Sequence, residues 1–154
     1  MSLLLSFFRF ILARRYDITI TGLEHLKQTG SKMIMPNHPG LIDPVIIFSH
    51  LSPYVTLSPV VTETYYNKPI LHGLFRRIQA VSIGDLARGT GDISEVSQTF
   101  SGISDGLESG KNILLYPSGQ IYSQDFESVI GKKSVYEVLV RATSQTRFIA
   151  VQTK

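Results

Sequence analysis

The chain of 154 residues contains no cysteine. This absence excludes disulfides, zinc sites built on cysteine, and a thiol nucleophile. Charged residues are also scarce, at 18% of the sequence against about a quarter in ordinary soluble domains. A hydrophobic content of 43%, punctuated by twelve glycines and seven prolines, predicts one domain with a real core and no signature of disorder.

The positive charge of the chain is small and local. The net charge is +3, which equals the contribution of the three arginines among the first fifteen residues, Arg9, Arg14 and Arg15. No stripe of basic residues interleaved with aromatic residues runs along the sequence, so nucleic acid is not expected as a partner. A basic end attached to an apolar stretch instead suits an anionic membrane surface.

Residues 2–13 are largely apolar but few. As a helix they would be roughly 18 Å long, against about 30 Å for the hydrocarbon core of a bilayer, so they cannot span it. Ser2, Ser6, Arg9 and Ala13 recur at helical spacing and form one small or polar stripe. No positive charge precedes the apolar run and no cleavage site follows it, so a secretory signal is not indicated. We expect residues 1–15 to form an amphipathic helix lying in the membrane interface; packing on the protein's own core, or a remnant anchor, are the alternatives.

Apolar patterning predicts an α/β fold for residues 16–154. Strands are expected at 16–21, 32–35, 55–62, 78–83, 112–116 and 148–151, with a turn and short helix at 22–30. Helices are expected at 44–51, 69–77, 92–109 and 132–143, the third capped by Asp92 and closed by Gly110. Strands that alternate with helices favour a mostly parallel sheet flanked by helices on both faces.

One loop places a histidine and a carboxylate close together in sequence. His38 and Asp43 lie between an expected strand and an expected helix, where α/β folds usually keep reactive groups. Residues five apart face differently on a helix, so the two side chains can meet only if the loop bends, which Pro39 and Gly40 permit. An imidazole held by a carboxylate can remove a proton from an alcohol. The positive end of the following helix would favour the carboxylate and any nearby oxyanion. Asp43, followed by Pro44, has the alternative role of a helix N-cap.

The order of several blocks resembles the phospholipid/glycerol acyltransferase family, the lysophosphatidic acid acyltransferases and their relatives. Residues 37–43, Asn-His-Pro-Gly-Leu-Ile-Asp, are similar to the family's Asn-His-x-x-x-x-Asp block. Residues 115–120, Leu-Tyr-Pro-Ser-Gly-Gln, are similar to its Phe-Pro-Glu-Gly-Thr-Arg block. The segments 18–24, 73–83 and 149–151 fall where the opening, middle and final blocks are expected. The resemblance covers residues 16–154, and the order of the blocks is more specific than any one of them.

The resemblance implies transfer of a fatty acyl group from a thioester of coenzyme A or acyl carrier protein to a hydroxyl of a glycerolipid-type or other lipid acceptor. It implies His38 as general base and Asp43 as the residue that orients it. The residues it places on the substrate side are Asn37, Pro117, Ser118 and Gly119. No metal and no cofactor besides the thioester is expected. The expected partners are the acceptor, the thioester donor and a membrane surface, with peripheral attachment on the cytoplasmic face.

Some positions depart from the family pattern. Ser118 stands where the family has glutamate, Ile121 where it has arginine, and Gly84-Asp85 where another arginine is expected; the last block lacks its proline. In the family that the chain resembles, those arginines are expected to hold the phosphate of the acceptor. Their absence here means that the resemblance does not imply a phosphate on the acceptor. Four basic residues are candidates to replace the missing arginines: Arg76, Arg77, Lys132 and Lys133. The alternative is that these four are solvated surface charges. The sequence also stops where such domains continue, so we expect it to lack their last strands.

Two other classes of function compete with the enzyme. The altered third block favours a non-catalytic lipid-binding or membrane-docking module with a degenerate acyltransferase fold. A serine hydrolase using Ser118 is disfavoured, because Tyr116 and Gln120 occupy the glycine positions of a Gly-x-Ser-x-Gly elbow. No glycine-rich nucleotide motif follows a strand. His25, His50 and His72 are expected to be structural or surface residues, since no pair of them has metal-ligand spacing with a carboxylate.

Overall fold

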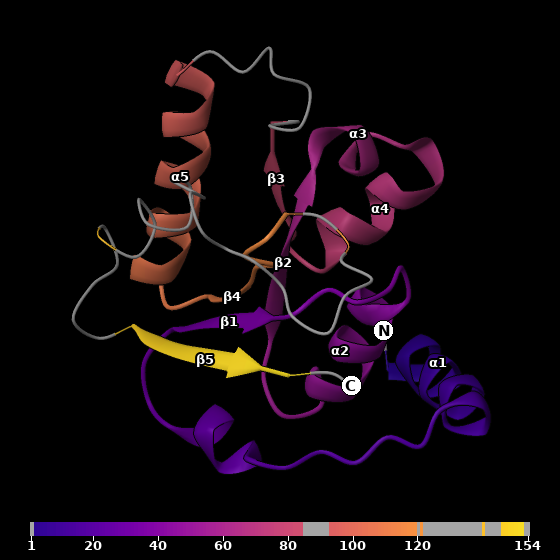
Figure 1. Ribbon diagram of the computed structural model, residues 1–154. Helices are drawn as coiled ribbons and strands as arrows, with labels where there is room; N and C mark the ends of the chain where they lie inside the picture. Colours follow the sequence, from indigo (N-terminus) through magenta and orange to yellow (C-terminus); the bar gives the residue numbers. More distant parts are fainter. Residues whose placement is uncertain (1, 85–92, 120, 122–139, 141–145, 153–154) are drawn as a thin grey trace.

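The fold is built on a five-stranded parallel sheet. The computed structural model describes residues 2–84, 93–119, 121, 140 and 146–152. The strands are β1 (Lys32–Pro36), β2 (Leu57–Thr62), β3 (Val81–Ile83), β4 (Asn112–Leu114) and β5 (Arg147–Val151). Their order is β3-β2-β4-β1-β5, and every neighbouring pair is parallel. In Figure 1, β1 and β5 run across the view while β2 and β3 rise steeply, which is the twist expected of such a sheet.

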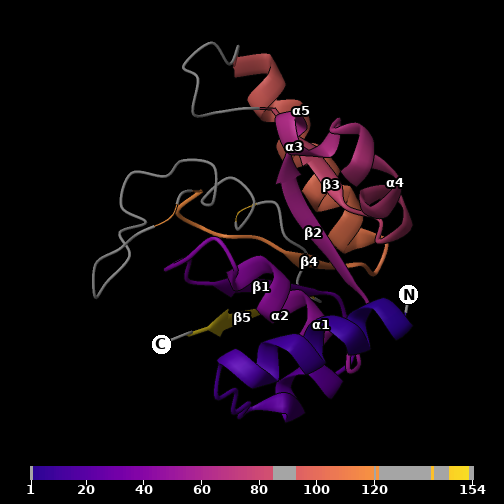
Figure 2. The ribbon, with the colours of Figure 1, turned by 90° about the vertical axis from the view of Figure 1, so that its right-hand side faces the viewer.

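Helices connect and cover these strands. They are α1 (Ser2–Arg15), the 3₁₀ helix Leu23–Lys27, α2 (Asp43–Leu51), α3 (Glu63–Tyr66), α4 (Pro69–Arg77) and α5 (Ile93–Glu108). Figure 2 shows α1 and α2 together at one end of the molecule and α5 at the other. The predicted α/β class, with a parallel sheet between helices, is therefore confirmed.

The core lies on both faces of the sheet, because successive residues of a strand point to opposite sides. Met33 and Ile113 pack with α5 on one face. Their chain neighbours Ile34 and Leu114 pack with α2 on the other. All four side chains are fully buried, and burial of each stabilises the fold by about 1.5–3 kcal/mol. This two-sided burial explains why residues 33–36 of β1 and 113–114 of β4 are continuously apolar and do not alternate with polar residues.

The strand predicted at 16–21 is wrong. This segment is extended, but within the described residues it pairs with no strand. Ile20 instead packs against the apolar cluster on the α2 face. The alternation of apolar and polar residues therefore arises because one side of this segment is buried, and it does not indicate a strand of the sheet.

Other predicted elements differ mainly at their ends. The strand predicted at 78–83 begins only at Val81, because Ile78 closes α4 and Gln79 takes a φ of +54°. The strand predicted at 112–116 ends at Leu114. Of the helix predicted at 132–143 only Val140 is described, and the cap at Asp92 lies outside the described residues.

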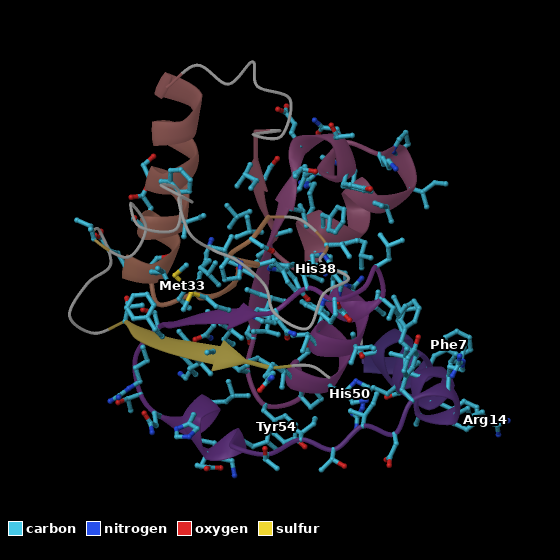
Figure 3. The ribbon with its side chains drawn as sticks, in the orientation of Figure 1. Phe7, Arg14, Met33, His38, His50 and Tyr54 are labelled. Carbon is cyan, nitrogen blue, oxygen red and sulfur yellow. The ribbon has the colours of Figure 1, made fainter. Side chains whose placement is uncertain are left out.

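Helix α1 packs on α2 and also leaves an apolar face exposed. Leu12 is buried and Leu5 and Phe8 are half-buried, so one stripe of the helix joins the body of the protein. Phe7 and Phe10 remain 57% and 58% exposed. Figure 3 shows Phe7 and Arg14 projecting away from the sheet. Among the helices that the structure describes, none has both the length and the apolar character needed to cross a bilayer.

The contact of α5 with β4 depends on a glycine. A Cβ at Gly106 would lie 3.2 Å from Cδ1 of Ile113, whereas one at Gly102 would meet nothing within 4 Å. We expect Gly106→Leu to lower the free energy of unfolding by about 1–3 kcal/mol through overpacking. The matched Gly102→Leu should raise it by about 0.5–0.8 kcal/mol, since only helix propensity changes. Urea titration measures both, and equal effects at the two positions would contradict this account of the packing.

Candidate active site

The candidate site lies where two neighbouring strands of the sheet end. Beyond β1, the Asn37 N–H donates to the carbonyl of Val151 on β5 (3.1 Å). Beyond β4, the Leu115 N–H donates to the carbonyl of Ile34 on β1 (2.9 Å). After β1 the next strand along the chain is β2, and after β4 it is β5. The connections that leave the neighbouring strands β1 and β4 therefore run in opposite directions across the sheet. Such a switch point is where open α/β sheets bind their ligands.

The loop after β1 bends so that His38 and Asp43 meet. His38 Nδ1 lies 3.2 Å from Asp43 Oδ2, and the two side chains are only 15% and 9% exposed. The Gly40 N–H donates to the same carboxylate oxygen (2.6 Å), and the Asp43 N–H donates back to the Gly40 carbonyl (3.2 Å). Figure 3 places His38 near the middle of the molecule, whereas His50 lies on α2, apart from it. The loop is thus held in its bent form by hydrogen bonds from His38 and Gly40 to the Asp43 carboxylate.

Asp43 does not cap the helix, so that alternative is wrong. The N-cap position belongs to Ile42, no side chain bonds to the first turn there, and Asp43 already lies inside α2. Its carboxylate points back into the loop because Gly40 and His38 are its donors. Pro44 occupies the first turn as predicted.

The first amide groups of α2 are already engaged. The Asp43 N–H binds Gly40, the Val45 N–H binds the Ile42 carbonyl (3.0 Å), and Pro44 has no N–H. Residues 43–45 therefore offer no free backbone N–H group that could donate to an oxyanion, although that contribution was expected of this helix end. The positive end acts on the Asp43 carboxylate through its field instead.

The hydrogen bond selects the form of the imidazole. An ionised carboxylate only accepts, so Nδ1 of His38 carries the hydrogen that Asp43 receives. In the neutral ring, Nε2 is then the nitrogen that can accept a proton. This is the arrangement that a general base requires.

A tyrosine packs against the histidine ring. The ring centroids of His38 and Tyr116 are 4.4 Å apart, with 35° between their planes. In the sequence, Tyr116 lies in a family-like block and is not among the expected site residues. The only local signal is its position just before Pro117 at a strand end, where the backbone is held extended.

The other predicted site residues lie in the two loops. Asn37 and Pro117 are half-buried, Gly119 is exposed with a φ of +66°, and its N–H donates to the Tyr116 carbonyl (3.1 Å). The contact of Tyr116 with His38 brings this second turn beside the first loop. Ser118 is only 2% exposed. A nucleophilic serine must reach its substrate, so this burial also counts against the serine hydrolase.

The remaining basic residues that the sequence singled out lie on helices or outside the described residues. Arg76 and Arg77 are exposed in the last turn of α4, whereas Lys132 and Lys133 are not described. His50 contacts the Ile46 carbonyl, and His72 packs on Tyr66. Within residues 2–84, 93–119 and 146–152, no three His, Asp or Glu side chains come together as metal ligands.

The geometry predicts the tautomer of His38. In the wild-type protein, the neutral ring should carry its hydrogen on Nδ1, because Asp43 accepts it. Replacement by Asp43→Ala should remove this preference and shift the ring toward the Nε2–H form. Long-range ¹H–¹⁵N correlation spectra of the two imidazole nitrogens measure the ratio, with the exposed His25 as internal control. An unchanged ratio in the variant would show that the carboxylate does not set the tautomer.

Comparison with known proteins agrees with the blocks in the sequence. The acyltransferase family model matches residues 17–153. The crystal structure of the 1-acyl-sn-glycerophosphate (LPA) acyltransferase PlsC from Thermotoga maritima is similar in fold, with a TM-score of 0.60 over 89% of this chain at 15% identity. The chain covers 53% of that protein, about half its length. No curated protein matches the sequence.

The family match and the likeness in fold have different weight. At 15% identity the solved structure bears on the fold alone, and the fold is the parallel sheet with its flanking helices. The family match takes in both loops of the candidate site and all the strands described above. The chain therefore belongs to the phospholipid/glycerol acyltransferase family that its blocks resemble.

Proposed function

We propose that this protein transfers a fatty acyl group from a thioester of coenzyme A or acyl carrier protein to a hydroxyl of a lipid acceptor. The observation that carries the proposal is the bond of His38 to Asp43, in a loop that the Gly40 amide closes on the same carboxylate. Family membership supplies the reaction class, and this pair supplies the base that the reaction needs.

The mechanism begins with the acceptor's hydroxyl. His38 Nε2 takes its proton while the oxygen attacks the carbonyl carbon of the thioester, and Asp43 stabilises the imidazolium that forms. The tetrahedral intermediate then breaks its C–S bond, and the imidazolium returns the proton to the departing thiolate. Base catalysis of this kind contributes about 10²–10⁴-fold. Positioning of donor and acceptor supplies the larger share.

The two loops supply the residues proposed to meet the substrates. Asn37 comes from the loop that carries the proposed base, and Pro117 and Gly119 come from the turn after β4. The expected substrate contact of Ser118 in the same turn is not kept, because its side chain is only 2% exposed. In the family pattern, arginines accompany this turn, whereas here Ile121 stands in the place of one of them and is exposed. Both a phosphate-bearing acceptor and an uncharged lipid alcohol are therefore candidate acceptors, and the lipid panel described below distinguishes them. Arg76 and Arg77 remain the described cations that could serve a phosphate.

Helix α1 is proposed to hold the protein on the cytoplasmic face of a membrane. Its exposed side carries Phe7 and Phe10, and its end carries Arg14 and Arg15. Aromatic side chains suit the headgroup level of a bilayer, and arginines attract anionic lipids. The predicted interfacial position and the alternative of packing on the body are thus compatible, because different stripes of the helix serve each.

Removal of the base should abolish transfer. His38→Ala should lower kcat by about 10²–10⁴-fold, because the hydroxyl then loses its proton acceptor. Asp43→Asn should lower it less, since the ring keeps its place but loses its charged partner. The measurement uses labelled acyl-CoA and acyl carrier protein thioesters with a panel of phosphorylated and neutral lipid alcohols, and the product is identified by mass spectrometry.

The matched control for this experiment is His25→Ala. That histidine is exposed on the 3₁₀ helix before β1, whereas the candidate site follows the other end of that strand, so its loss should leave kcat unchanged. Full activity in His38→Ala would remove His38 from the mechanism. If the wild-type protein binds lipid and transfers no acyl group from any donor, the non-catalytic lipid-binding module is the correct function.

The membrane proposal has its own test. The double variant Phe7→Ser, Phe10→Ser should weaken partition to vesicles containing a third anionic lipid by at least about tenfold, because two aromatic side chains leave the interface. Binding should also fall as salt is added, since the arginines contribute by charge. Sedimentation with vesicles measures both effects. The control is Tyr54→Ser, an exposed aromatic residue outside α1; equal losses in both proteins would reject α1 as the membrane contact.

A further inference from the structure

We infer that Tyr116 is a positioning residue for the reaction, holding the plane of the His38 imidazole and favouring its protonated form during acyl transfer. The inference rests on the proposed function. It starts from the packing of the two rings, with centroids 4.4 Å apart and planes inclined by 35°.

The backbone of Tyr116 is fixed on both sides. Before it, the Leu115 N–H is bound to β1 through the Ile34 carbonyl. After it, Pro117 restricts Tyr116 to extended conformations, and the Gly119 N–H closes a turn on the Tyr116 carbonyl. Gly119 has a φ of +66°, which a residue with a side chain adopts only with strain. The aromatic ring therefore projects from a turn with little freedom to move.

The tyrosine and Asp43 restrain different motions of the imidazole. The hydrogen bond at Nδ1 fixes the direction of the ring within its own plane. It restrains tilting about that bond only weakly, because hydrogen bonds tolerate moderate bending. Tyr116 covers one face of the ring and restrains this tilt. Together the two contacts direct Nε2 toward one place.

The aromatic face also has an electrostatic effect that changes during the reaction. A cation within about 6 Å of a ring centroid is attracted by the π system, and the attraction grows when water is excluded. The His38 side chain is largely buried against Tyr116. In the proposed mechanism the ring becomes a cation when it takes the acceptor's proton. The attraction is then larger in the transition state than in the ground state, so it affects kcat more than KM.

Two variants test this inference. Tyr116→Phe keeps the aromatic face and should retain kcat within about twofold, whereas Tyr116→Leu removes the face and should lower kcat about tenfold. KM for donor and acceptor should change little in either. The control is Tyr65→Leu, which removes an exposed tyrosine on α3 and should leave kcat unchanged.

A spectroscopic readout separates this effect from a loss of stability. The Tyr116 ring should shift the His38 Hδ2 and Hε1 resonances upfield and give nuclear Overhauser effects to them in the wild-type protein. Both signals should persist in Tyr116→Phe and vanish in Tyr116→Leu. If Tyr116→Leu does not fold, Tyr116→Met carries the same comparison, because methionine fills similar volume without an aromatic face.

The outcomes distinguish the inference from the function on which it rests. If wild-type protein is active, His38→Ala is inactive and Tyr116→Leu keeps kcat, only the role of Tyr116 is overturned. Equal losses of kcat in Tyr116→Phe and Tyr116→Leu would also overturn it, because the aromatic face would not be the cause. If the wild-type protein transfers no acyl group, the proposed function fails and this inference fails with it.

Discussion

The Asp43 carboxylate accepts two hydrogen bonds from its own loop, and the rest of the candidate site depends on them. The Gly40 N–H and the His38 ring are its donors, at 2.6 and 3.2 Å. A carboxylate with so little exposure is costly unless its oxygens are bonded, so the loop conformation that satisfies Asp43 is strongly preferred. The same conformation fixes the imidazole. The structural need of the acid and the role proposed for the imidazole are therefore met by one arrangement.

The sheet determines where this loop meets its neighbour. β1 lies between β4 and β5; it pairs with β5 over its whole length and with β4 at Met33 and Ile34. Because β1 and β4 are buried on both faces, their ends are held by packing with α2 and α5. The loops that follow them inherit this rigidity. Tyr116 and His38, 78 positions apart in the chain, are in contact for that reason.

Features encoded in neighbouring residues could be predicted from the sequence, and features that depend on a distant partner could not. The spacing of Phe100, Ile103 and Leu107 predicts α5 because burial repeats with the helical turn. The meeting of His38 with Asp43 could be foreseen from Pro39 and Gly40 between them. The segment 16–21 was mistaken for a strand, because alternation shows which side is buried and not whether a ladder partner exists. The direction of the Asp43 carboxylate and the contact of Tyr116 also depend on tertiary structure.

The departures of this chain from the family pattern bear on the reaction in different ways. A thioester is already a reactive acyl donor, so transfer to an alcohol needs a base and needs no nucleophile from the protein. The burial of Ser118, in the place of the family's glutamate, is compatible with that chemistry and incompatible with a serine nucleophile. The adjacent Tyr116 packs on His38, the proposed base, so the turn after β4 contacts the imidazole even though it lacks the family's charged side chains. Loss of those charges therefore weighs on the choice of acceptor more than on the proton transfer itself.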